Sequence, residues 1–352
     1  MLPLRNFLFF LVLLICIKVH AQFVPAAFKK TVDSVLTIQP KTFKDLESIL
    51  GVHQKDTVLM GYLADNAAKQ KYFVGQAYAL NHLGRRYRDL SQYSKALALH
   101  QRALEAATEA NSIEFRVFSL NMLSVVFRRT DAIKSALDNS QEALSLAESV
   151  QNPSEGLKRG INVSLNNIGN IYKTLEQYDI AIEKFEESLK LDVELNNLLG
   201  LAVNYQNIGE CYEAQGKLEE ALQNHRTSLA YNEEIDYERG KIICRNSIAH
   251  VYVHQDKPED AVGILEAQLQ AAKELGDIDV LTTVQINLGW TLIHLKRHEE
   301  ARGHLSESLD LAQKHNLPTA ISEANLYLSH LWAEKADFEK SLFYFKNYRR
   351  SE

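Results

Sequence analysis

The sequence predicts an all-α fold in which two-helix units stack on one another as an α-solenoid. Small residues recur at an almost constant spacing of 40 over residues 73–352, and apolar residues between them follow the three- and four-residue spacing of amphipathic helices. The composition agrees with this fold. The 352 residues are 46% hydrophobic and include only 15 Gly and 6 Pro, which indicates an ordered chain with ample core.

Each repeat is marked by an apolar residue, a small residue, and an apolar or aromatic residue three positions later. The small residues are Gly84, Ser124, Gly169, Gly209, Ala249, Gly289 and Ser329. Twelve positions after each one comes a second small residue: Ala96, Ala136, Ala181, Ala221, Ala261, Ala301 and Ser341. One spacing is 45 instead of 40, and we interpret its five extra residues, 152–156, as a lengthened surface loop.

Each repeat contains two amphipathic helices separated by a short break. In the fourth repeat the break falls at residues 215–217, between two runs with helical apolar spacing. We expect Gly209 and Ala221 to face each other where these helices cross, because bulkier side chains would push the axes beyond the usual 8–10 Å. Pro258 and Pro318 occupy predicted first helical positions, where a missing N–H costs nothing.

The pattern is clearest in the third repeat, with Ile168, Gly169, Tyr172, Ala181 and Phe185. On these residues the chain resembles a tetratricopeptide-repeat protein of the long variety, with repeats of about forty residues. The resemblance covers residues 73–352 and implies a right-handed α-solenoid of about seven repeats, the last one incomplete or uncapped. The chain is similar to exported bacterial proteins of this family and to sensor regions of bacterial signalling proteins.

Residues 1–21 have the features of a signal peptide. Arg5 is followed by an apolar run from Phe7 to Ile17, and residues 19–21 resemble a cleavage site, so we expect the mature chain to begin at Gln22. An uncleaved anchor is the weaker alternative, because the apolar run is far shorter than the roughly twenty residues of a membrane-spanning helix. We therefore expect an exported protein, periplasmic or at the cell surface or secreted, with no membrane span after cleavage.

Residues 22–72 do not follow the repeat spacing. We expect a degenerate helical N-terminal cap, with helices over 28–38, 43–50 and 56–69. At the other end, the last helix carries Leu342, Phe343, Phe345 and Tyr348 close to the final residue. This uncapped end either offers a surface for a partner or for self-association, or is simply exposed to solvent.

The family resemblance places the concave groove one and four residues after each small residue, and three and six before it. The candidate groove residues are Asn81, Arg85, Arg88, Asn121, Arg128, Asn166, Asn170, Lys173, Glu210, Glu213, His250, Trp290 and His330. Bases outnumber acids 8 to 4 over residues 72–130, whereas acids outnumber bases 15 to 5 over 174–240. We expect the basic, amide-rich part to bind an acidic peptide or protein segment, and a solvated charged face is the alternative.

Other function classes have little support in the sequence. The net charge of −6 argues against a dedicated nucleic-acid binder. Phosphate-binding loops, nucleophile elbows and zinc-protease motifs are missing, so we expect no catalytic residues, no enzyme activity and no cofactor. Cys211 and Cys244 fall on apolar helix faces and are expected to be free thiols.

Two histidine pairs have a spacing of four residues, which places both rings of each pair on one helical face. They are His250 with His254, and His294 with His298 one repeat later. A transition metal could bridge neighbouring helices there. We instead expect partly exposed histidines with polar contacts and no metal.

Two functions therefore compete. The first is a non-catalytic interaction scaffold that binds a peptide or protein segment in its groove. The alternative is a sensory or regulatory region of a bacterial signalling system, as a shortened relative of a kinase, cyclase or transcription-regulator chain.

Overall fold

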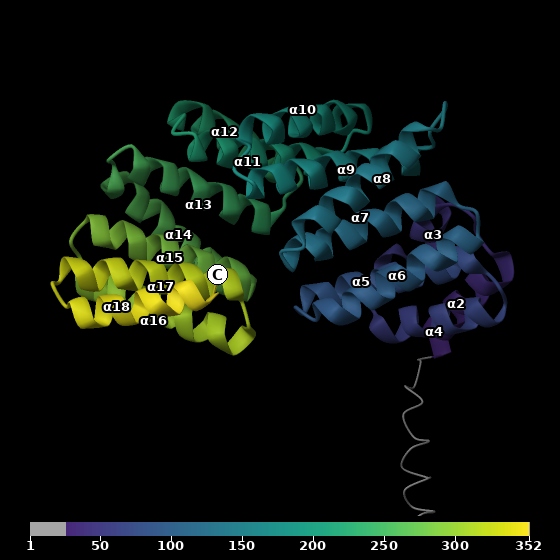
Figure 1. The fold of residues 1–352 in the computed structure, drawn as a ribbon, viewed down its shortest axis with the longest axis horizontal. Coiled ribbons are helices and arrows are strands. Elements are labelled where there is room, and N and C mark those ends of the chain that lie inside the picture. Colours follow the sequence, from purple (N-terminus) through teal and green to yellow (C-terminus); the bar gives the residue numbers. More distant parts are fainter. Residues whose placement is uncertain (1–25, 352) are drawn as a thin grey trace, which may run out of the picture. The chain divides into compact units, whose positions relative to one another are not determined.

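A computed structural model describes residues 26–351 of the chain, and the predicted signal peptide and mature start at Gln22 lie outside them. Over the described residues the secondary structure consists of α-helices and one short 3-10 helix, which confirms the all-α prediction (Figure 1). None of these helices combines the length and the apolar character that crossing a membrane requires.

Contacts divide the chain at Gly160 into two compact units, each a stack of helices. The first unit contains α2 (Ala26–Ile38), α3 (Phe43–Leu50), a 3-10 turn (Gly51–His53), α4 (Thr57–Lys69), α5 (Phe73–Asp89), α6 (Tyr93–Glu109), α7 (Ile113–Arg129) and α8 (Ile133–Glu148). Its first three α-helices confirm those predicted before the repeats. Thr42 and Asp56 cap α3 and α4 by accepting hydrogen bonds from backbone N–H groups of the first turn.

The division falls within α9 (Glu155–Thr174). The second unit continues with α10 (Tyr178–Glu194), α11 (Leu198–Ala214), α12 (Leu218–Glu234), α13 (Glu238–His254), α14 (Pro258–Leu275), α15 (Ile278–His294), α16 (His298–His315), α17 (Pro318–Glu334) and α18 (Phe338–Ser351). From α4 to α8 and from α10 to α18, helices adjacent in sequence pack against each other, as do first helices of consecutive repeats, for example α13 with α15. The two prolines begin α14 and α17, as predicted.

A residue with left-handed backbone conformation ends most helices, and these residues recur every 20 positions through much of the chain. Ser91, Asn111 and Asp131 mark the turns after α5, α6 and α7, and Gly216 and Gly276 do the same in the second unit. Hydrogen bonds from Ser91 N to Arg88 O and from Gln92 N to Tyr87 O close one such turn. The 40-residue period of the sequence therefore corresponds to two helices, each ended in most repeats by a residue with left-handed conformation.

The small residues of the repeat allow close packing within each helix pair. A Cβ atom added at Gly209 would lie 2.6 Å from the ring of His225, which supplies all three of its nearest atoms. His225 lies one turn further along α12 than Ala221, and the facing of Gly209 and Ala221 stays a prediction. Gly169 meets Phe185 in the same way.

Three further details differ from or complete the sequence analysis. Helix α9 begins at Glu155 and so includes the last two residues of the expected loop. Cys211 and Cys244 are buried and free, as predicted. On α18, Phe343 is 59% exposed and Leu342 51% exposed, so part of the apolar C-terminal face is open.

Candidate functional site

Three arginines form a cationic cluster on the first helices of two neighbouring repeats in the first unit. Arg85 and Arg88 lie one turn apart in the last part of α5, and Arg128 lies at the end of α7, which packs against α5. All three are partly buried. We call these residues the arginine cluster.

Within the described residues, Arg85 and Arg128 form no ion pair, and only Arg88 does, through Asp89 at 2.8 Å. Burial lowers the pKa of Arg85, and the charge of Arg88 adds to this effect. Burial also lowers the pKa of Arg128 to about 10, with further contributions from Arg129 and Arg88. Both guanidinium groups are therefore partly desolvated and repelled by a neighbour of the same charge. Asp89 and Glu47 attract Arg85 without forming an ion pair with it, and no carboxylate of the described residues acts on Arg128 in this way.

Neighbouring side chains position the cluster. Asn81 lies one turn before Arg85 and connects three helices, because its amide donates to Ser119 Oγ on α7 at 2.8 Å and its oxygen contacts His100 Nδ1 on α6 at 2.8 Å. Burial and the charges of Arg88 and Arg85 lower the pKa of His100 to about 3, so this ring is neutral. Arg85 also lines a small cavity of about 170 Å³.

Two asparagines predicted for the groove are instead part of the core. Asn81 is 0% exposed and Asn121 is 1% exposed, and the Asn121 amide donates to Gly160 O at 3.0 Å. The prediction that they present amides to a ligand is therefore wrong. Their side chains instead form hydrogen bonds with groups on neighbouring helices. The arginines further along each helix remain as the groove candidates.

The predicted basic surface does not extend through the third repeat. The Lys173 ammonium forms an ion pair with Glu210 and donates to Asn207 Oδ1 at 2.9 Å, so its charge is neutralised. Asn166 donates to Asn204 Oδ1 at 2.8 Å, and Asn170 donates to Asn166. Burial would raise the pKa of Glu210, but Lys173 outweighs this and lowers it.

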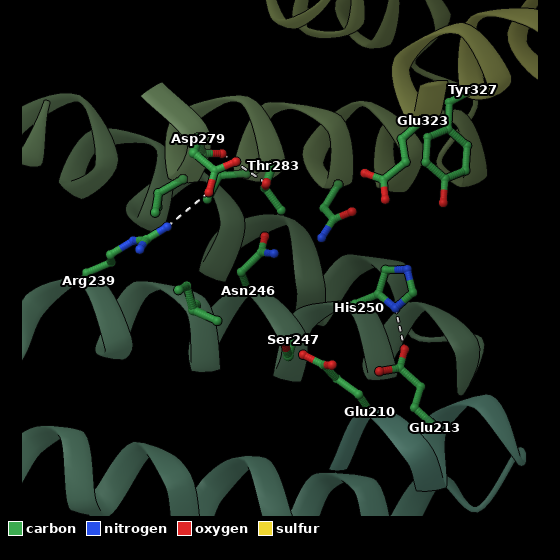
Figure 2. A pocket seen from close by; sticks show the side chains of 14 residues that line it. Glu210, Glu213, Arg239, Asn246, Ser247, His250, Asp279, Thr283, Glu323 and Tyr327 are labelled. Carbon is green, nitrogen blue, oxygen red and sulfur yellow. Dashed lines mark hydrogen bonds and ion pairs between the residues drawn. The ribbon is translucent and has the colours of Figure 1, made fainter. Parts of the chain in front are cut away.

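The second unit has a cavity of about 460 Å³ on α11, α13, α15 and α17, the first helices of four consecutive repeats (Figure 2). Four carboxylates and two amides are among its fourteen lining residues. They are Glu210, Glu213, Asp279, Glu323, Asn246 and Asn287. Arg239 lies at one side, paired with Asp279 at 3.0 Å. This cavity is acidic, in contrast to the arginine cluster of the first unit.

Two polar groups in this cavity have no partner among the described residues. Glu323 on α17 forms no ion pair, and burial raises the pKa of its carboxyl group. Asn246 is 5% exposed, and its side-chain oxygen accepts no hydrogen bond. Figure 2 shows both side chains directed into the cavity. They can hydrogen-bond a polar ligand there.

The three aromatic groove residues predicted for the last repeats do lie in one row. The ring of His250 lies 4.5 Å from that of Trp290, and Tyr327 links Trp290 to His330, with centroid distances of 5.9 and 6.1 Å. Tyr327 was not predicted. Beneath the row, Glu213 contacts His250 Nδ1 directly and lies 3.7 Å from His254 Nε2.

The pairs Lys173–Glu210 and Glu213–His250 follow one rule, which the sequence analysis missed. In each pair, the residue four positions after the small residue of one repeat contacts the residue one position after the small residue of the next. His225 was not predicted as a site residue, because the sequence places it at an apolar-face position of α12, one turn after Ala221 and Leu222. Its Nε2 atom lies 3.7 Å from Glu213 Oε2.

Family models described as tetratricopeptide repeats match residues 76–114, 160–234 and 243–314, together more than half of the chain. No curated protein matches the chain by sequence. These matches agree with the repeat register read from the small residues.

Several solved structures share the fold at low sequence identity. A Rap protein complexed with competence and sporulation factor has a TM-score of 0.70 at 15% identity, with 95% of this chain and 89% of that chain covered. The apo form of the quorum sensor NprR from B. thuringiensis has a TM-score of 0.64 at 15% identity, with coverages of 92% and 97%. The Rap conjugation regulator of plasmid pLS20, in complex with the Phr* peptide, has a TM-score of 0.64 at 17% identity, with coverages of 81% and 76%. These similarities establish the α-solenoid architecture.

Proposed function

Because the chain belongs to the tetratricopeptide-repeat family, whose extended helical surfaces serve binding, we propose that it is a non-catalytic scaffold that binds a peptide or protein segment. The arginine cluster of the first unit binds a carboxylate of that segment. The similar Rap regulator of plasmid pLS20 is a complex with the Phr* peptide, and the similar Rap protein is a complex with competence and sporulation factor, which supports this class of ligand.

The observation that carries the proposal is the pair of partly buried guanidinium groups, Arg85 and Arg128, that form no ion pair within residues 26–351. A buried charge is costly unless it is paired, and arginine presents a planar set of donors that matches a carboxylate. Elsewhere the protein pairs its groove cations, as Lys173 with Glu210 and Arg239 with Asp279 show. Arg85 and Arg128 are therefore suited to receive an anionic group from outside the chain.

A random peptide library displayed on phage tests this proposal with protein beginning at Gln22. We expect selection to enrich peptides containing Asp or Glu, and the double variant Arg85→Gln/Arg128→Gln to bind them at least about tenfold more weakly, a loss of roughly 1.4 kcal/mol. The matched control is Arg102→Gln on α6, which removes the same charge from an exposed position with no ion pair among the described residues.

Binding by wild type and Arg102→Gln should be equal and should weaken with salt, because exposed charges are screened within about 8 Å at physiological ionic strength. Enrichment of basic or purely apolar peptides, or equal binding by the double variant, would show that the arginine cluster is only a solvated face.

The second candidate function is a sensory region in which peptide binding is the input signal. Its support is the similarity to the quorum sensor NprR. The two functions differ in consequence: a sensor alters the activity of a second protein when the peptide binds, whereas a scaffold only holds its partner. Measuring a captured partner's activity with and without a selected peptide separates them.

A further inference from the structure

We propose that Glu213, His250 and His254 bind a first-row divalent transition metal ion in the second unit. His250 and His254 lie one turn apart on α13, and Glu213 comes from the neighbouring helix α11. One ligand atom from each lies within 4.8 Å of the others. Two imidazoles and a carboxylate suit ions such as Zn²⁺, Cu²⁺ and Ni²⁺.

To hold an ion, His250 Nδ1 and Glu213 Oε1, which are in direct contact, would have to move apart while His254 turns towards them. Ligand atoms around a tetrahedral zinc ion lie about 3.4 Å apart, given Zn–N and Zn–O distances of about 2.0–2.2 Å. His254 Nε2 is 3.7 Å from Glu213 Oε1, and the His254 side chain is 45% exposed, so it has room to turn. Glu213 and His250 also line the cavity of the second unit, which leaves a coordination position for a water molecule or ligand.

An independent observation comes from His225, which is 0% exposed. Gln206 donates through its Nε2 atom to Glu210, a carboxylate that can only accept, so the Gln206 oxygen is the atom that faces His225 Nδ1 at 3.1 Å. With Nδ1 facing Gln206, the Nε2 atom of His225 is directed at Glu213.

That Nε2 atom has no hydrogen-bond partner among the described residues and lies 3.7 Å from Glu213 Oε2. The other carboxylate oxygen, Oε1, faces His250 and His254. His225 therefore supports the carboxylate through the oxygen that the two histidine ligands do not contact, as residues behind a metal ligand commonly do.

The equivalent place in the first repeat shows the contrast. His100 has the same position as His225 and contacts Asn81 as His225 contacts Gln206. Where the fourth repeat has Glu213, the first repeat has Arg88. Both repeats therefore have a buried histidine at this position. Of the two, only the fourth repeat combines it with a carboxylate and a neighbouring histidine pair.

The test uses protein without a histidine tag, freed of metal with EDTA and titrated with Zn²⁺ by isothermal titration calorimetry. We expect one Zn²⁺ per chain, and binding weakened by at least about tenfold in His254→Ala and in Glu213→Gln. The matched control is His294→Ala, which removes a ring that contacts Trp290 from the next helix at 5.0 Å but is not one of the three ligands.

Trp290 gives a second readout, because its ring lies 4.5 Å from that of His250 and 5.1 Å from that of His254. Stoichiometric Cu²⁺ should quench its fluorescence in wild type and in His294→Ala, and should quench it much less in His254→Ala. Circular dichroism confirms that each variant is folded. Absence of stoichiometric Zn²⁺ binding, or equal affinity in all four proteins, would overturn the proposal. The arginine cluster lies in the other unit, so either result leaves the peptide-binding proposal to its own test.

Discussion

Asp192→Ala is expected to lower the free energy of unfolding by about 3 kcal/mol, the largest stability effect that we predict for a single substitution. The Asp192 carboxylate is 0% exposed. It accepts hydrogen bonds from the amides of Asn162 at 2.8 Å, Asn197 at 2.6 Å and Asn204 at 2.7 Å. The substitution leaves three amide groups without this acceptor in the interior of the second unit.

The sign of this effect depends on the amides rather than on the charge. Burial raises the pKa of Asp192 although the three hydrogen bonds lower it, so the buried charge by itself is unfavourable. Removing the carboxylate relieves that cost but leaves donors without partners, and the loss of the donors' acceptor dominates.

Urea unfolding followed by circular dichroism measures the difference. The control is Asp310→Ala on the exposed face of α16, expected to change the free energy of unfolding by less than about 0.5 kcal/mol. Equal stability of the two variants would contradict the view that Asp192 holds the packing of α9, α10 and α11 together.

Arg85→Met/Arg128→Met is expected to have the opposite effect and to raise the free energy of unfolding of the free protein by about 1–2 kcal/mol. Methionine keeps much of the apolar stem that packs against the helices and removes a partly desolvated charge. It also removes the repulsion from Arg88 that both guanidinium groups experience. Under this proposal the two charges destabilise the free protein but are needed for binding. The double variant should therefore be more stable than wild type and bind the peptide more weakly.

Thermal unfolding of the double variant tests this result, with Arg102→Met as the control. Arg102 is exposed, so its substitution should change the free energy of unfolding by less than about 0.5 kcal/mol. A double variant less stable than wild type would mean that the arginines contribute packing or pairing within the protein, contrary to the argument.

The repeat register was predictable because it depends on local properties of the chain. Side-chain periodicity identifies helices, and the small residues identify where two helices approach each other, so all the helix pairs from α5 to α18 could be predicted. The turns were less visible: the left-handed positions are occupied by Ser91, Asn111 and Asp131 as well as by Gly216.

The site was predictable only in part, because burial depends on contacts between helices that the register does not describe. Asn81 and Arg85 both fall on predicted groove positions, yet Asn81 hydrogen-bonds within the core, whereas Arg85 forms no ion pair in the part of the chain that the structure describes. Lys173 lost its expected role because the next repeat places Glu210 opposite it. Where Glu210 stands in the fourth repeat, the second repeat has Val125, so the sequence supplies no acid at that position for Arg88.

A double-mutant cycle between the peptide and Arg128 tests the central claim most directly. A library-selected acidic peptide and its Glu→Gln or Asp→Gln form are each titrated against wild type and Arg128→Gln by fluorescence polarisation, which gives four dissociation constants. If a peptide carboxylate binds the arginine cluster, the two changes are coupled by about 1.5 kcal/mol or more, because each one removes the same interaction. If their effects simply add to within about 0.5 kcal/mol for every carboxylate of the peptide, the carboxylates do not contact Arg128 and the proposed site is wrong.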